Sequence, residues 1–158
     1  NSFDIRKSWA NTVIDYFNDG DSRCIITFSN YAKVSVPFLP VHHRQFMLNV
    51  VEDITPTLAT YVYDGLSLAL EAHNWRNPDQ LRKSVIVLLS DGLAPNDDRL
   101  DAIASEIDSL NCILHVVQTR FAEDKYVNQL KTLAENAGGV YLQGVSFKPE
   151  RIAPLIRH

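Results

Sequence analysis

The segment Val85–Gly92, which reads Val-Ile-Val-Leu-Leu-Ser-Asp-Gly, constrains the fold of this 158-residue chain more than any other segment. Five apolar residues in a row are typical of a strand buried on both faces, as in a parallel sheet covered by helices. Asp91 then ends the strand, and ligands of open α/β sheets bind beyond the carboxyl ends of the strands. Asp91 is therefore a candidate binding residue, or else a strand-exit carboxylate that bonds nearby backbone amides.

Strands and helices alternate along the chain. The apolar spacing predicts helices at 3–17, 44–54, 62–73 and 124–136, and another that Asp97 or Asp98 caps and that continues to about Leu110. Short apolar runs predict strands at 23–28, 33–38, 85–89, 112–117 and 140–142, and the last element, from about Pro149, is expected to be helical.

The first two predicted strands form an edge hairpin, because Pro37 and Pro40 interrupt the second of them and proline is tolerated at sheet edges. The complete order predicts an α/β fold of the Rossmann-like, doubly wound type. It has one mostly parallel central sheet, helices on both faces and one antiparallel edge strand.

The composition limits the classes of function. A net charge of −4 with scattered Lys and Arg residues argues against a nucleic-acid partner. No apolar run approaches the roughly 20 residues that cross a bilayer, so no membrane span is predicted. Cys24 and Cys112 each open an apolar run without CxxC spacing, which favours buried free thiols over a zinc or redox site.

Recognised catalytic and nucleotide-binding motifs are missing. The chain has no GxGxxG loop, no GxxxxGK[ST] loop and no GxSxG turn around Ser90. Its five histidines are dispersed and lack convergent partners, which favours structural or solvated roles: His42, His43, His73, His115 and His158. A protein that is not an enzyme is expected.

Several segments, spread over almost the whole chain, together resemble a von Willebrand factor type A (VWA) domain of the integrin I-like kind. They are the opening helix with Phe3, the strand Ile25–Ser29, Thr60 before a helix, the strand ending Ser90-Asp91-Gly92, and the run Leu130–Tyr141. In that run a helix rich in Leu and Ala leads through Gly138-Gly139 into a short aromatic strand. The resemblance implies that residues 1–158 form a single VWA-like domain.

The resemblance also implies a metal-ion-dependent adhesion site (MIDAS). In the family, an Asp-x-Ser-x-Ser loop, a threonine and an aspartate hold Mg²⁺, or Mn²⁺ or Ca²⁺, and oxygen ligands of this kind suit Mg²⁺. By position, Thr60 and Asp91 match the threonine and the aspartate. Thr57 is the alternative threonine, because Leu58-Ala59 stands where the family often has Gly-Gly.

One part of the family pattern is absent. No Asp-x-Ser-x-Ser occurs in the sequence, and the resemblance implies that this loop and its strand lie upstream of Asn1. That strand would separate the strands at 23–28 and 85–89, which are therefore not expected to pair with each other. Either residues 1–158 are not the whole folding unit, or another segment takes that place.

The function that the resemblance implies is metal-dependent recognition of a protein or extracellular-matrix ligand that offers a carboxylate. The expected location is extracellular or at the cell surface. The binding rim would include Ser29, Asn30, Tyr61, Leu93 and Asn96, although ordinary loop polarity explains each of them equally well. The alternative is an intracellular or periplasmic scaffold of the same fold that binds partners without a metal.

Overall fold

The computed structural model describes residues 2–28, 31–55, 61–91 and 97–156, and side chains from residue 5 onward. The helices are α1 (Ser2–Tyr16), α2 (Arg44–Glu52), α3 (Val62–Arg76), α4 (Arg99–Ser109), α5 (Asp124–Asn136) and α6 (Ala153–Ile156). The strands are β1 (Arg23–Phe28), β2 (Ala32–Leu39), β3 (Ser84–Ser90), β4 (Cys112–Gln118) and β5 (Tyr141–Gln143). Short 3-10 turns at Val41–His43 and Pro149–Arg151 precede α2 and α6. The predicted α/β class is confirmed.

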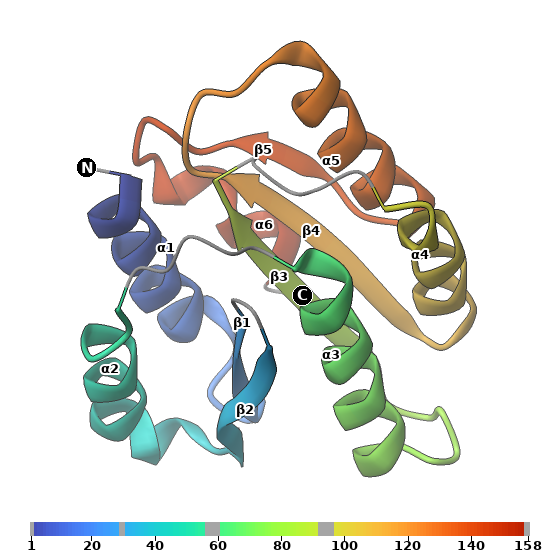
Figure 1. Ribbon diagram of the computed structural model, residues 1–158. Helices are drawn as coiled ribbons and strands as arrows, with labels where there is room; N and C mark the ends of the chain where they lie inside the picture. Colours follow the sequence, from blue (N-terminus) through green and yellow to red (C-terminus); the bar gives the residue numbers. More distant parts are fainter. Residues whose placement is uncertain (1, 29–30, 56–60, 92–96, 157–158) are drawn as a thin grey trace.

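Strands β3, β4 and β5 form a parallel sheet in that order (Figure 1). The β3–β4 register is unbroken from the pair Ser84 and Cys112 to the pair Ser90 and Gln118. Helix α4 connects β3 to β4, and α5 connects β4 to β5, as parallel neighbours require. The predicted βαβ units are therefore present in this half of the chain.

Both faces of the parallel sheet are covered. Along β3, Ile86 and Leu88 pack into a core with α3, α4 and α5, whereas Val87 and Leu89 pack with α1 and α6 on the other face. This alternation explains why the strand has no polar residue between Val85 and Leu89, since neither face meets water.

Gly138-Gly139 joins α5 to β5 through two different backbone requirements. Gly138 has φ +76°, the left-handed conformation that commonly follows a helix end. A Cβ on Gly139 would lie 1.7 Å from the carbonyl oxygen of Leu114 in β4. The first glycine therefore ends the helix, and the second lets the chain pass directly against the sheet.

The predicted hairpin is present as β1 and β2, which pair antiparallel. The prediction that Pro37 interrupts the second strand is wrong, because β2 continues through Pro37 to Leu39. The register shifts between the pairs of Arg23 and Ile25, opposite this part of β2, so no regular ladder bond is required of the proline there.

Strands β1 and β3 do not pair with each other, as expected, and the described strands form two separate sheets. They nevertheless run in the same direction. Arg76, at the end of α3, donates to Ser22 just before β1, and His73 in the last turn of α3 bonds to Ser84 at the start of β3. At the other end, Phe28 of β1 lies against Gly65 in the first turns of α3.

A groove of about 1310 Å³ lies between β1 and β3, and every residue of both strands lines it. Helix α1 forms one wall, and helix α3 forms the opposite wall. No strand among the described residues lies in the groove. The strand expected upstream of Asn1 therefore stays a prediction, and the place between β1 and β3 stands open in the described part of the chain.

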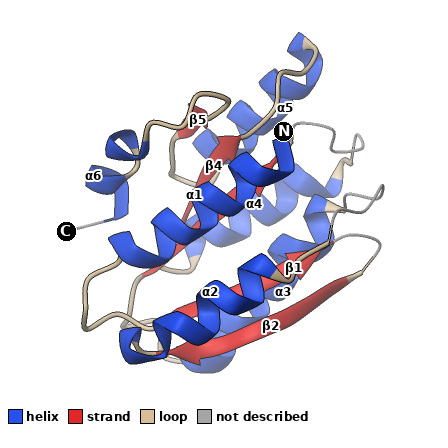
Figure 2. Cartoon of the chain, turned by 90° about the vertical axis from the view of Figure 1, so that its left-hand side faces the viewer, coloured by secondary structure: helices blue, strands red, loops and turns tan. Residues whose placement is uncertain are grey.

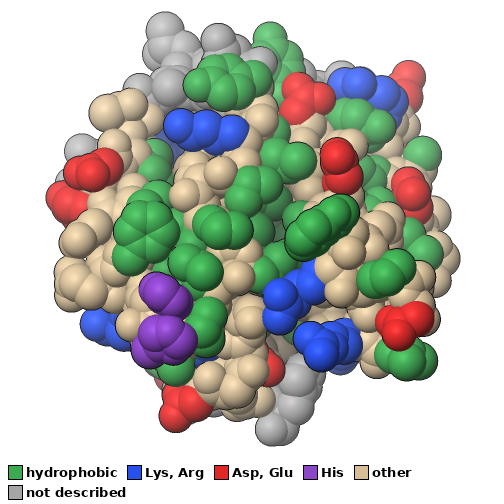
Figure 3. Space-filling model, turned by 90° about the horizontal axis from the view of Figure 1, so that it is seen from below, with side chains coloured by type: hydrophobic (Ala, Val, Ile, Leu, Met, Phe, Trp, Pro, Cys, Tyr) green, Lys and Arg blue, Asp and Glu red, His purple; other side chains and the backbone are tan. Residues whose placement is uncertain are grey.

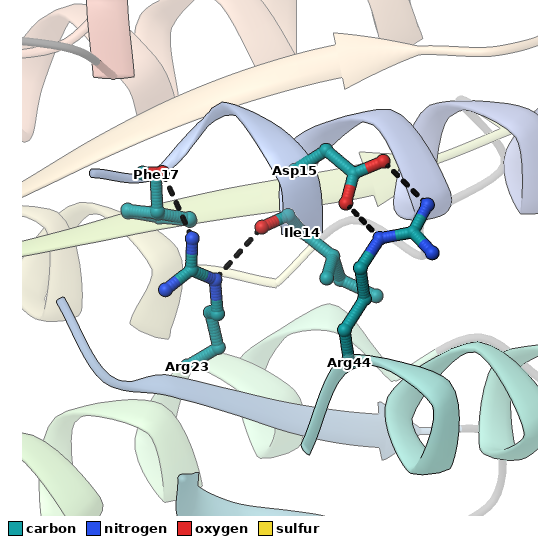
Figure 4. Close-up of polar contacts among 5 residues, drawn as sticks. All are labelled: Ile14, Asp15, Phe17, Arg23 and Arg44. Carbon is teal, nitrogen blue, oxygen red and sulfur yellow. Dashed lines mark hydrogen bonds and ion pairs between the residues drawn. The ribbon is translucent and has the colours of Figure 1, made fainter. Parts of the chain in front are cut away.

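Polar contacts fasten α1 to β1 and α2 (Figure 2 shows these elements side by side). The buried Arg23 guanidinium donates from Nε to the Ile14 carbonyl at 2.8 Å and from Nη2 to the Phe17 carbonyl at 2.8 Å (Figure 4). The Ile14 carbonyl lies in the last turn of α1 and the Phe17 carbonyl directly follows the helix, so Arg23 caps its C-terminal end. Arg44 of α2 makes a bidentate ion pair with Asp15 of α1, at 2.5 and 2.9 Å.

Candidate functional site

The candidate site lies beyond the carboxyl ends of β3 and β4, where Asp91 directly follows β3. Helix α4 lies on one face of the sheet and leads from β3 to β4, whereas α1 lies on the other face and leads to β1 (Figure 1). The chain thus diverges in opposite directions on the two sides of β3. In open α/β sheets this divergence produces the ligand-binding crevice.

A buried polar network fixes the strand ends at this crevice. Thr119, which follows β4, donates to the Ser90 carbonyl from its backbone N–H at 2.8 Å and from its hydroxyl at 3.2 Å. The Gln118 side chain donates to the Arg120 carbonyl at 2.6 Å and pairs with the Tyr141 hydroxyl. Because these buried groups are hydrogen-bonded, the backbone that presents Asp91 is held in place.

The network extends to α1 through β5. The Gly144 N–H donates to the Gln118 carbonyl at 2.7 Å, and the buried Trp9 indole donates to the Gly144 carbonyl at 2.9 Å. The Trp9 ring also meets Phe147 edge-on, with the ring centroids 5.1 Å apart. Helix α1 is therefore positioned against the same end of the sheet that carries Asp91.

Arg6 of α1 lies within electrostatic reach of Asp91. Burial of the guanidinium lowers the pKa of Arg6, and the negative charge of Asp91 acts in the opposite direction. Arg6 stays charged at neutral pH, because an arginine pKa begins far above it. The carboxylate at the crevice therefore has a positive side chain near it, a feature that sequence reasoning did not detect because α1 and β3 are far apart in the chain.

Among the predicted metal ligands, Asp91 is the one that lies within the described residues. Within these residues, no three His, Cys, Asp or Glu side chains converge in a way that could hold a metal ion. Mg²⁺ uses only one or two protein carboxylates and completes its shell with hydroxyls, carbonyls and water. Asp91, a partly buried residue directly after β3, could supply one such carboxylate.

Of the other predicted site residues, the structure describes one, Tyr61. Tyr61 is 45% exposed and directly precedes α3, which begins at the crevice end of β1. The remaining predicted metal and rim residues lie outside the described residues: Ser29, Asn30, Thr57, Thr60, Leu93 and Asn96. The structure thus brings Asp91 and Tyr61 to the same end of the molecule and does not test the rest.

Two exposed aromatic residues at this end were missed by sequence reasoning. Tyr31, in the turn after β1, is 61% exposed, and Phe121, in the loop after β4, is 77% exposed. Aromatic side chains are enriched in protein interfaces, where they supply large contact areas. The detectable signal was an aromatic residue shortly after a predicted strand end, a position that the fold leaves open to solvent.

The structure defines an α/β protein of the Rossmann-like, doubly wound class. The profile of the von Willebrand factor type A domain matches residues 1–152, and the chain belongs to this family. VWA domains are generally protein-interaction modules rather than enzymes, and they are commonly extracellular or secreted. No described helix has the length and apolar character that a membrane crossing requires.

Solved structures of similar fold come from distant relatives. An aerotolerance-related membrane protein from Bacteroides fragilis, with multiple mutations to serines, is 16% identical, with a TM-score of 0.77 over 98% of this chain and 85% of that chain. BatB from Bacteroides thetaiotaomicron is 13% identical, with a TM-score of 0.77 over 98% and 86%. At these identities the likeness shows the fold alone. The comparison with curated proteins found no match.

A third structure, proximal thread matrix protein 1 from the mussel byssus, has a zinc-occupied MIDAS motif. It is 17% identical, with a TM-score of 0.66, and the match covers 98% of this chain but 39% of that protein. The metal is a property of the byssus protein, and the shared feature is the fold.

Proposed function

We propose that this chain is a recognition module that binds a protein or extracellular-matrix ligand at the crevice beyond β3 and β4. The observation that carries the proposal is the position of Asp91 at the point where the chain diverges, on a strand end that Thr119 holds by two hydrogen bonds. A fixed carboxylate at this point suits metal-assisted or direct polar recognition. The expected location is extracellular or at the cell surface.

The metal-dependent form of the proposal assigns Mg²⁺, or Mn²⁺ or Ca²⁺, to the crevice. Asp91 and Thr60 would be ligands, together with an Asp-x-Ser-x-Ser loop ahead of Asn1. The bound ion would supply an open coordination position that a carboxylate of the partner fills. The family match and the zinc-occupied MIDAS of the byssus protein support this form.

Arg6 supports the second candidate, a scaffold that binds its partner without a metal. The Arg6 guanidinium supplies positive charge near Asp91, and in the metal-dependent form a metal ion supplies that charge. The exposed Tyr31, Tyr61 and Phe121 would then provide most of the contact area. In both forms the partner binds beyond the carboxyl ends of β3 and β4. The forms differ in whether a metal ion or Arg6 neutralises the charge of Asp91.

Metal titration of the intact protein distinguishes the two forms. In calorimetry with Mg²⁺ or Mn²⁺, Asp91→Asn is expected to weaken binding roughly tenfold or more, as loss of ordered metal-site contacts does. Arg6→Gln is expected to strengthen it by about three- to tenfold, because an opposing unit charge a few ångströms away costs about 1 kcal/mol in a hydrated site.

The matched control is Asp101→Asn, which removes an exposed carboxylate from α4 and should leave metal affinity unchanged. Absence of metal binding, or equal binding by the Asp91→Asn variant, would overturn the metal-dependent form. Partner binding that persists in EDTA but is lost when Tyr61 and Phe121 are changed to alanine would favour the scaffold.

A further inference from the structure

A shallow hollow of about 470 Å³ lies between α3 and α4 and shares no lining residue with the groove between β1 and β3. The two helices pack against each other, and both begin at the crevice end of the sheet. Leu70 and Ile103 line the hollow and are buried, whereas Trp75, Glu71 and Glu106 line it and are exposed. The hollow therefore combines an apolar base with an aromatic ring and two carboxylates.

The exposed groups of the hollow have no charged or aromatic partner among the described residues. Trp75 is 86% exposed, and within this part of the chain its ring makes no ring-stacking or cation–π contact. Neither Glu71 nor Glu106 forms an ion pair there. The adjacent Arg76 is directed elsewhere, because its guanidinium lies 4.9 Å from the centroid of the Phe38 ring of β2.

The other end of the hollow already holds a guanidinium. Tyr63 of α3 lines this end, and the guanidinium of Arg99, the first residue of α4, lies 3.9 Å from the centroid of its ring. Arg99 also forms an ion pair with Asp97, with 2.7 Å between Nη2 and Oδ2. An aromatic ring of α3 and a nearby carboxylate thus hold an arginine side chain there. Trp75 and its two glutamates repeat this combination without the arginine.

Buried polar contacts fix the last turn of α3, which carries Trp75. The buried His73 imidazole bonds through Nδ1 to the Ser84 hydroxyl, and its Nε2 lies 2.7 Å from the carbonyl oxygen of Leu110, which directly follows α4. These contacts hold the end of α3 against the end of α4, so the backbone positions of Trp75 and Glu106 are fixed relative to each other. A site that is already assembled binds at a lower entropy cost.

The charge around the hollow favours a basic partner. Seen from the end where β3 begins, acidic side chains lie between hydrophobic ones on the right, the side of α3 and α4 in Figure 1, and a group of Lys and Arg side chains lies near the middle (Figure 3). Arg82 and Lys83 line the groove between β1 and β3 and not this hollow. With a net charge of −4 on the whole chain, a basic segment would be attracted to this side.

We propose that the hollow between α3 and α4 binds an arginine side chain of a partner protein, stacked on Trp75 and paired with Glu71 and Glu106. Tryptophan is the aromatic side chain that attracts cations most strongly. A planar guanidinium can stack on a ring while its N–H groups donate to carboxylates. The hollow is separate from the crevice that carries Asp91, so this contact goes beyond the proposed function and requires no metal.

The test is an NMR titration of the chain with the peptide acetyl-Gly-Arg-Gly-amide. The control peptide carries citrulline, which has nearly the shape of arginine without its charge. The expected result is a saturable shift of the Trp75 indole N–H signal, with no shift of the buried Trp9 indole, which donates to Gly144. The citrulline peptide should bind at least about fivefold more weakly, because it loses the cation–π contact and the ion pairs.

Two matched pairs of substitutions test the location. Glu71→Gln combined with Glu106→Gln should weaken binding of the arginine peptide about fivefold. Glu135→Gln combined with Glu150→Gln changes the net charge equally, outside the hollow, and should leave binding unchanged. All four side chains are exposed, so each variant is expected to fold.

Equal binding of the citrulline peptide, or equal weakening by the two pairs of substitutions, would overturn the proposal. A Trp75 signal that shifts with the concentration of the free chain, and no longer does so after the Glu71 and Glu106 substitutions, would also overturn it. In that case an arginine of a second copy would be the occupant. Metal binding at the crevice is measured separately, so failure here and failure of the proposed function are distinguishable.

Discussion

Strands β3, β4 and β5 pair in unbroken register between helices on both faces. Among the described strands, β1 and β2 pair only with each other, across two register shifts. In the three-stranded sheet nearly every residue of β4 is buried. In the hairpin of β1 and β2 most residues are only partly buried. What joins the regions is helix packing and side-chain contacts from Arg23, Arg44 and Arg76 rather than strand pairing. The comparison indicates that a strand in this fold is buried most completely when it pairs with another strand along both edges, as β4 does.

The largest effect is expected where the three-stranded region is tightest. Gly139→Ala places a methyl group 1.7 Å from the Leu114 carbonyl oxygen, which requires the backbone of β4 or β5 to move. A loss of about 4 kcal/mol or more in the free energy of unfolding is expected, or failure to fold. Urea denaturation measures it, with Gly20→Ala as control, because a Cβ at Gly20 meets nothing within 4 Å. Equal stability of the two variants would contradict the tight approach of β5 to β4.

Two leucines compare β4, which has a strand on both edges, with β3, which has a described strand on one edge. Leu114 of β4 is fully buried, and its replacement by alanine is expected to cost about 2–5 kcal/mol. Leu89 of β3 lines the groove and is only partly buried, so Leu89→Ala is expected to cost about 1 kcal/mol. Denaturation curves of the two variants provide the measurement. A cost at Leu89 equal to that at Leu114 would mean that the groove is already filled.

The smallest effect concerns the ion pair that joins α1 to α2. Hydrogen bonds from Arg44 lower the pKa of Asp15 below its ordinary value of about 3.9. A lowered carboxylate pKa stabilises the folded state above about pH 4, and this contribution is lost as the pH falls through the lowered folded pKa. Because both side chains are substantially exposed, water screens the ion pair, and its contribution to stability is small and decreases with salt.

This effect is measured by comparing the pH dependence of unfolding between the native chain and Arg44→Met. The variant should lose part of the stability that the native chain gains as the pH rises through the lowered pKa of Asp15. Lys131→Met removes an exposed positive charge from α5 and serves as the control for net charge. A pH dependence that Arg44→Met leaves unchanged would show that packing alone holds α2 to α1.

Much of the fold was predictable because its signals are local. The apolar run Val85–Leu89 and the helix preceding Gly138-Gly139 lie where the sequence indicates them. The prediction at Pro37 was wrong because a register shift, a property of two strands, decides whether a proline fits. The choice between Asp97 and Asp98 as the cap of α4 was also left open. The structure places Asp98 at the N-cap position without a capping bond from its side chain, and the side chain of Asp97 accepts the Arg99 N–H at 3.0 Å.

The candidate site was predictable only in part. Asp91 stood out because it follows a continuous apolar strand, a feature visible in one short segment. Arg6 and Thr119 carried no such signal, because their roles depend on elements that are distant in the chain. The burial of Arg23, which caps α1, could not be predicted either, since an arginine at the start of a strand is more often exposed.

The sequence by itself determined the alternation of strands and helices, the two-faced burial of β3 and the carboxylate at its end, because periodicity and strand-end chemistry act over a few residues. Only the tertiary structure decided which side chains surround Asp91, and that β1 and β3 stand as facing, parallel edges of one groove. Those features depend on how segments that are distant in the chain pack together. The groove in particular is lined by residues of α1, β1, α3 and β3, so the sequence of one segment could not predict it.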